Sequence, residues 1–403
     1  MRIRGAKSRS EPRHGFRFDF TGTALLLRWS GNRSDQNLLE FGNDDRRFMG
    51  LKTFSFDSEW QNPSQMNHLI TCTLRGIVLP RCGGLTACAI ADDFYRLMGI
   101  TGSRMSFGQL FVNDVYFGLY TLAEEMDSQW IEAQYAALCI ERLSFHRRAF
   151  SYVHNSWEKH KGNYYDIDWG QWLGDPKQAL QSVKQSEGDG NMTDYLSLVK
   201  LLNSCALAFP SQFVSCRDYC DLRTNYTTAA FASVFDVERY CRAAVIEVFS
   251  VYGDGYIISG NNYGLYHNPL TGLFDYTTRD YESTMMASPL GKGIYEDYHS
   301  LTGYNPILWK RLLQDASLRA TYSDYFTRFL TRVFSVSGRA QLLDRIGELG
   351  SIVSHLLAHD YFYALEGGRN ATVAQSWVDR TQDWVLQRAT TCASALNLTL
   401  PPS

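Results

Sequence analysis

Three polar residues in the second half of the chain have the types and the order that phosphoryl transfer requires. Asp254 stands between two glycines in the segment VYGDGYIISGNN, Asn262 ends that segment, and Asp280 follows a short hairpin pattern. A carboxylate can orient an attacking hydroxyl, and carboxylate and amide oxygens are ligands that Mg²⁺ accepts alongside phosphate oxygens. We therefore interpret Asp254 as a candidate catalytic residue and the other two as candidate metal ligands.

The same residues also have a purely structural interpretation. Asp254 and the pair Asn261-Asn262 would each lie in a turn, and Asp280 would be an ordinary surface residue, because motifs defined by spacing alone are often accidental. The two glycines that flank Asp254 permit an unusual backbone there, or the close approach of a substrate. On these residues alone, both interpretations stay open.

The elements around Asp254 predict how the three residues would be positioned. The pattern FDVERYCRAAVIEVFSVY predicts a long helix that begins at a cap on Asp236 and leads directly to Asp254. The following YGLYHNPLTGLFDYTT predicts a hairpin around NPLTG, with Asp280 after its second strand. Such a hairpin would return the chain to one cleft. The apolar residues of the predicted helix fall on one face, at positions 237, 241, 244, 245, 248 and 249.

The first third of the chain predicts mainly strands. Apolar and aromatic runs predict strands at FRFDF, ALLLRW and LKTFSF, and a short helix at ADDFYRLMG that ends at Gly99. The segment RMSFGQLFVNDVYFGLYTLAEEMD predicts a hairpin, because two apolar strand patterns flank the turn signal Asn113-Asp114.

The remainder predicts mainly helices. DSQWIEAQY predicts a helix capped by Asp127, and MTDYLSLVKLLN predicts another, capped by Thr193 or Asp194. Residues 137–190 have an irregular pattern, and from about residue 304 the pattern is helical almost to the end. We therefore predict an α+β fold of two lobes, strand-rich over residues 1–126 and mainly helical over 127–403.

Composition limits the class of protein. The 403 residues are 45% hydrophobic and 20% charged, which is typical of a globular chain with a large core. A net charge of −3 gives no global electrostatic case for binding nucleic acid, and no 18-residue apolar stretch predicts a transmembrane helix. The N-terminus lacks the apolar run of a signal peptide, yet five N-x-S/T sequons favour a secreted or cell-surface protein, so the compartment stays open.

Four segments resemble the CotH kinase family, the atypical kinases of the spore-coat and invasin type. VYGDGYIISGNNYGLYHNPLTGLFDYTTRDYEST resembles the family's hallmark segment, and FDVERYCRAAVIEVFS the helix ahead of it. FVNDVYFGLYTLAEEMD resembles the family's strand pair, and MRIRGAKSRSEPRHGFRFDF resembles its opening. The four segments occur in the family's order and cover most of residues 1–335.

The resemblance implies an atypical protein-kinase-like fold in a single domain over residues 1–403, truncated at its N-terminus. It implies ATP and Mg²⁺ or Mn²⁺ as cofactors. Phosphate would go to Ser or Thr of a serine-rich or basic protein substrate, with no role for nucleic acid. By position it also implies roles for seven residues: Asp254 as the catalytic aspartate, Asn262, Asp280 and Glu282 as metal ligands, and Arg9, Arg13 and Glu124 at the nucleotide.

Two departures from the family favour a second hypothesis. Arg13-His14 stands where the family has a lysine pair, and arginine is not a geometric substitute for lysine. Residues 70–90 also look like an insertion, which we expect to lie outside the core. The second hypothesis is a catalytically degenerate surface or adhesion protein that keeps the fold and binds a partner.

Overall fold

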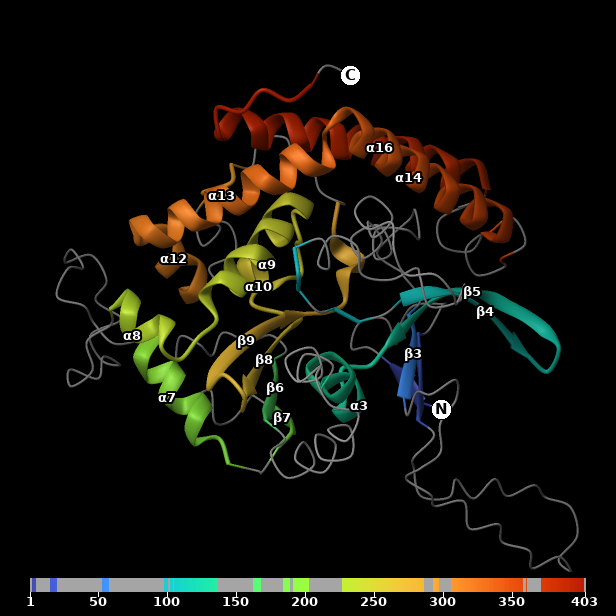
Figure 1. Cartoon of the computed structure of the whole chain (residues 1–403). Helices are drawn as coiled ribbons and strands as arrows, with labels where there is room; N and C mark the ends of the chain where they lie inside the picture. The colour runs from blue at the N-terminus through green and yellow to red at the C-terminus, as the bar shows by residue number, and fades with distance from the viewer. Residues whose placement is uncertain are drawn as a thin grey trace, which may run out of the picture.

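In the computed structural model, a central helix lies between the second of two antiparallel sheets and a group of C-terminal helices, and the first sheet lies to one side (Figure 1). The α+β class is thereby confirmed, while the kinase-like arrangement of lobes and the boundary at residue 126 stay predictions. The structure describes residues 2–4, 15–19, 53–57, 98–100, 102–103, 105–136, 162–167, 184–188, 191–202, 227–285, 293–296, 306–357, 360 and 371–401.

The first sheet has the order β1-β2-β3-β5-β4. Its strands are β1 (Arg2–Arg4), β2 (Gly15–Asp19), β3 (Thr53–Asp57), β4 (Met105–Val112) and β5 (Val115–Glu124). The predicted strands at FRFDF and LKTFSF and the predicted hairpin are confirmed. Asn113 and Asp114 have φ values of 51° and 62°, the left-handed backbone that a tight hairpin turn needs. The segments ALLLRW, ADDFYR and 70–90 lie outside the described residues.

The second sheet has the order β7-β6-β8-β9. Its strands are β6 (Asn163–Ile167), β7 (Lys184–Glu187), β8 (Tyr263–Asn268) and β9 (Leu273–Thr278). The predicted β8–β9 hairpin is confirmed, but the prediction of irregular structure over 137–190 is wrong where β6 and β7 form. The adjacent residues Tyr164 and Tyr165 are both buried, so β6 lacks the alternation that marks a strand. It pairs with β8, far along the chain, which a local pattern cannot reveal.

The helical pattern predicted after residue 304 is confirmed. The helices there are α12 (Ile307–Gln314), α13 (Ala316–Val333), α14 (Val336–Leu357) and α16 (Ala371–Ala395). Figure 1 shows α14 and α16 running side by side, with α13 crossing the central helix. None of the helices in the described part of the chain is long and apolar enough to span a membrane.

The central helix is α9 (Val237–Ser250), which lies between α13 and the β8–β9 hairpin (Figure 1). Its predicted cap is confirmed, because the Asp236 side chain accepts a hydrogen bond from the Arg239 backbone N–H at 2.9 Å. All six apolar residues of the predicted face are buried, and the other sides of the helix are covered as well. The buried residues include the charged side chains Arg239 and Glu247, and the guanidinium of Arg388 from α16 binds carbonyl oxygens near the end of α9.

Shorter helices complete the described chain. They are α3 (Ser128–Ile131) with a π-helical turn (Glu132–Ala136), α7 (Thr193–Leu202), α8 (Thr228–Ala232) and α10 (Tyr256–Ser259). The cap predicted at Asp127 is confirmed, since its carboxylate accepts the N–H groups of Gln129 and Trp130. The cap predicted for α7 is wrong: the helix begins at Thr193, whose N–H donates to the side chain of Asn191 at 3.0 Å.

Candidate functional site

Asp254 lies in the tight loop between α9 and α10. The chain leaves α9 through Val251, which has a left-handed backbone with φ of 47°. Gly255 is the N-cap of α10, and a Cβ atom at this position would lie 2.2 Å from the ring of Tyr252. Glycine is therefore required here by the fold of the loop itself.

Asn262 binds Asp254 directly. Its Nδ2 donates to the backbone oxygen of Asp254 at 3.1 Å and to the carboxylate Oδ2 at 3.1 Å. Ser259 on α10 donates to the other carboxylate oxygen, Oδ1, at 3.4 Å. Because the amide nitrogen makes both contacts with Asp254, neither of them uses the amide oxygen of Asn262, an atom that is chemically suited to a cation.

The segment after β9 folds back onto this loop. The backbone N–H of Arg279 donates to the carbonyl oxygen of Asn262 at 3.1 Å. The hydroxyl of Tyr252 donates to the backbone oxygens of both Arg279 and Asp280, the latter at 2.7 Å. The loop and the Asp280 segment thus share contacts at one end of the β8–β9 hairpin.

A short 3₁₀ turn, Tyr281–Ser283, continues this contact. The N–H of Asp254 donates to the hydroxyl oxygen of Ser283 at 2.9 Å, and Asp280 is the N-cap of the turn. Glu282 lies within the turn, so its backbone is adjacent to Asp280. The sequence-predicted residues Asp254, Asn262, Asp280 and Glu282 therefore belong to one region of the structure.

The backbone of this region is unusual. Seven non-glycine residues in the described part of the chain have positive φ, and four of them lie between 251 and 285: Val251, Asn262, Asp280 and Met285. A left-handed backbone costs most L-residues about 1–2 kcal/mol, although Asn and Asp adopt it more readily, and such positions concentrate at functional sites. Holding Asn262 and Asp280 in this conformation sets the direction of the Cα–Cβ bond of both residues.

The donor set fits a hard cation that also binds phosphate. Asp280 supplies a carboxylate and Asn262 supplies an amide oxygen beside the Asp254 carboxylate, and Mg²⁺ commonly takes few protein ligands together with phosphate oxygens. No group of three or more His, Cys, Asp or Glu suited to a metal occurs among the described residues. A cation held by the Asp280 carboxylate and the Asn262 amide oxygen would thus depend on the nucleotide to complete its coordination.

Of the three residues predicted at the nucleotide, the structure describes Glu124 in the first sheet. Glu124 ends β5, opposite Phe54 of β3, and is 7% exposed. Arg9 and Arg13 lie outside the described residues. The chain that follows Glu124 reaches the second sheet, where the hydroxyl of Tyr164 on β6 donates to Met126 Sδ at 3.3 Å.

One buried acid near the loop was missed by the sequence analysis. Glu247, near the end of α9, accepts the backbone N–H of Ile257 at 3.2 Å and the hydroxyl of Tyr276. Burial raises the pKa of Glu247 to about 7, although these two hydrogen bonds lower it. The sequence feature that could have identified Glu247 is its position as a single acidic residue within the apolar run AAVIEVFS.

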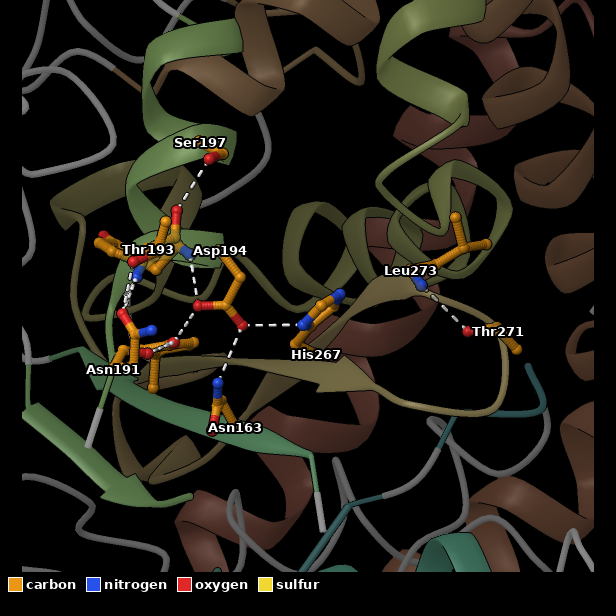
Figure 2. A network of polar contacts seen from close by, with 10 residues as sticks. Asn163, Asn191, Thr193, Asp194, Ser197, His267, Thr271 and Leu273 are labelled. Carbon is orange, nitrogen blue, oxygen red and sulfur yellow. Dashed lines mark hydrogen bonds and ion pairs between the residues drawn. The ribbon is translucent and has the colours of Figure 1, made fainter. Parts of the chain in front are cut away.

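A second polar cluster occupies the opposite end of the hairpin (Figure 2). Asp194 at the start of α7 binds Nδ1 of His267 on β8 at 2.8 Å, and it also accepts hydrogen bonds from Asn163 and Tyr165. Burial raises the pKa of Asp194, but these bonds outweigh it and lower the pKa to about 2. The hydrogen bond to Asp194 raises the pKa of His267.

The family model described as CotH kinase protein matches residues 1–392. The chain belongs to the CotH family. Inner spore coat protein H of Bacillus subtilis (strain 168) is 31% identical over 101 residues, which cover 25% of this chain and 27% of that protein. Invasin CotH3 of Rhizopus delemar is 23% identical over 257 residues, which cover 60% of this chain and 38% of the invasin.

The match to the CotH family confirms the resemblance drawn from the sequence. It extends over both sheets and the helices up to residue 392, well beyond the segments that carried the resemblance. The aligned parts span less than half of either named CotH relative. Activity, substrate and partners of this chain therefore remain matters for proposal.

Proposed function

We propose that this CotH-family chain transfers the γ-phosphate of ATP to Ser or Thr of a protein substrate, with Mg²⁺ or Mn²⁺. One observation carries the proposal: the Asn262 amide binds the Asp254 carboxylate at 3.1 Å, and the segment that contains Asp280 folds onto the same loop. Phosphoryl transfer depends on positioning and electrostatics rather than on covalent chemistry, and this arrangement supplies both.

In this proposal each residue has a distinct role. Asp254, held by Asn262 and Ser259, orients the substrate hydroxyl and accepts its proton. The Asn262 oxygen and the carboxylate of Asp280 hold the cation, with Glu282 as a further carboxylate in the next turn. When bound, the cation neutralises charge on the phosphates.

The nucleotide would lie between this loop and the first sheet. Glu124 would lie near the nucleotide at the end of β5, and Arg9 and Arg13 would face the phosphates. Arginine binds phosphate oxygens in a bidentate manner, so Arg13 can act here although the family has lysine at this position.

The acceptor is proposed to be a serine-rich or basic protein. The named relatives are an inner spore coat protein and an invasin. The replacement of the family's lysine pair by Arg13-His14 favours the alternative, a binding protein without phosphotransfer. The two functions differ in whether the chain binds ATP with a divalent cation.

The test uses the purified chain with ATP and Mg²⁺ or Mn²⁺. We expect ATP to raise the melting temperature only when the cation is present, and labelled γ-phosphate to enter the chain itself or a peptide rich in Ser, Arg and Lys. The variant His14→Lys restores one lysine of the family pair and is expected to transfer phosphate at least as fast as the wild type. If neither protein binds ATP or incorporates phosphate, the binding protein is the correct description.

A further inference from the structure

A buried carboxyl group lies directly beneath the Asp254 loop. Glu247 belongs to the last turns of α9 and is 2% exposed. Its Oε2 accepts the backbone N–H of Ile257 on α10 at 3.2 Å, and its Oε1 accepts the hydroxyl of Tyr276 on β9. One side chain therefore ties three elements together at the point where the chain turns toward Asp254.

The short helix α10 depends on this contact, because its own cap lacks a side chain. Gly255 makes no side-chain hydrogen bond as N-cap, so Glu247 supplies the acceptor that the first turn needs. The same helix carries Ser259, which donates to Asp254 Oδ1 at 3.4 Å, and leads to Asn262. A shift of α10 against α9 would therefore move both groups that orient Asp254.

The surroundings of Glu247 are aromatic. The nearest titratable groups on α9, α10, β8 and β9 are Tyr240, Tyr256, Tyr263 and Tyr276. From α16, the guanidinium of Arg388 binds the carbonyl oxygens of the next two residues of α9. Burial raises the pKa values of Tyr240 and Tyr263 well above their ordinary value, so these hydroxyls stay neutral at working pH. Among these groups it is Glu247 whose charge changes near pH 7, because burial raises its pKa to about 7.

We propose that Glu247 is a positioning residue for Asp254: its carboxylate fixes α10 against α9 and so holds Asp254 and Asn262 in the geometry that phosphotransfer uses. This inference rests on the proposed function. The ionised carboxylate accepts both hydrogen bonds fully, whereas protonation turns one oxygen into a donor and weakens the acceptor pair. The loop is therefore held most firmly when Glu247 is ionised.

The first test compares Glu247→Gln with the wild type. Glutamine keeps the shape but only one oxygen acceptor, so kcat is expected to fall by roughly 10- to 100-fold while KM for ATP stays within about twofold. Hydrogen exchange of residues 253–262 is expected to accelerate, whereas exchange at the hairpin turn, residues 268–273, stays unchanged.

The second test is a pH profile, which a merely structural role would not change. In the wild type, kcat is expected to decrease as pH falls through about 7. Tyr276→Phe removes one hydrogen bond that lowers the pKa of Glu247, so the midpoint should move to higher pH. In Glu247→Gln this step should be absent. If Glu247→Gln does not fold, Tyr276→Phe still tests the shift.

The outcomes separate the two proposals. An active wild type whose kcat, exchange and pH midpoint are all matched by Glu247→Gln would overturn the positioning role. A wild type without phosphotransfer would overturn the proposed function. Hydrogen exchange alone would then test whether Glu247 holds α10 against α9. Faster exchange at residues 253–262 in Glu247→Gln would support the hold on the loop, and unchanged exchange would refute it.

Discussion

The two ends of the β8–β9 hairpin carry polar clusters of different construction. At the open end, where β8 begins and β9 ends, Asn262 and Asp280 flank the hairpin. Both have left-handed backbones, with φ of 53° and 58°. At the turn end, the left-handed position belongs to Gly272, with φ of 70°, and the acid Asp194 is held by His267 and neighbouring donors.

The difference indicates which end is built for stability and which for chemistry. Glycine adopts a left-handed backbone without steric cost, so the turn end is a relaxed structure whose charges neutralise each other. The open end keeps an amide and a carboxylate at positions where glycine would be cheaper, and such strain is a feature of functional sites. The comparison therefore favours the Asp254 end as the reactive one.

The largest expected effect separates the two acids. Asp254→Asn keeps the shape but removes the anion that attracts the hydroxyl proton, so the phosphotransfer rate should fall roughly 10²- to 10⁴-fold. The matched variant Asp194→Asn should lower the free energy of unfolding by about 1–3 kcal/mol, because hydrogen bonds to a partly buried carboxylate are lost, while the rate per folded molecule is kept. Labelled-phosphate incorporation and chemical denaturation measure the two. Equal losses of phosphotransfer rate in both variants would contradict a catalytic role for Asp254 and a structural role for Asp194.

A second pair of variants replaces the left-handed residue at each end of the hairpin: a non-glycine residue by glycine at the open end, and glycine by alanine at the turn end. Asp280→Gly removes a left-handed non-glycine residue, so the free energy of unfolding should stay constant or rise by up to about 1 kcal/mol, while the Mg²⁺ concentration needed for activity rises. Gly272→Ala introduces a Cβ that meets nothing within 4 Å, so it should lower the free energy of unfolding by about 1 kcal/mol through its backbone alone, with activity kept. A large loss of stability in Asp280→Gly would show that the residue is structural.

The smallest effect concerns the pH dependence of the turn end. The His267 contribution to stability should be fully present below the ordinary pKa of 6.5 and lost as pH rises through the raised pKa of the folded protein. The Asp194 contribution should be present above the ordinary 3.8 and lost as pH falls toward about 2. The difference in free energy of unfolding between wild type and His267→Gln should therefore peak at about 0.5–1 kcal/mol between these limits and shrink above pH 7. A difference that is constant from pH 5 to 9 would contradict the ion pair.

Local patterns were sufficient to predict the open end of the hairpin. Asp254 and Asn262 are close in the sequence, and β8 pairs with β9 so that Tyr263 lies opposite Thr278. The residues just before and just after such a hairpin must meet, which is why Asp280 returns to Asn262. The helix cap at Asp236 is equally local, since its partner is only three residues away.

Contacts between distant segments were not predictable in this way. The pairing of β6 with β8 and the ion pair of Asp194 with His267 join segments far apart in the chain. Glu247 was missed for a different reason, because a charged residue on a helix normally predicts an exposed face. Only the packing of β9, α13 and α16 around α9 shows that this face is buried.

The most direct test of a metal site at the open end of the hairpin is Mn²⁺ binding in the presence of ATP, measured by electron paramagnetic resonance. If the open end is the site, the wild type and Asp194→Asn should bind Mn²⁺ with ATP equally well. Asp280→Asn and Asn262→Ala should bind it much more weakly, because the first removes the negative charge of a carboxylate ligand and the second removes the amide oxygen. Equal binding by all four proteins, or no binding by the wild type, would contradict a metal site formed by Asn262 and Asp280.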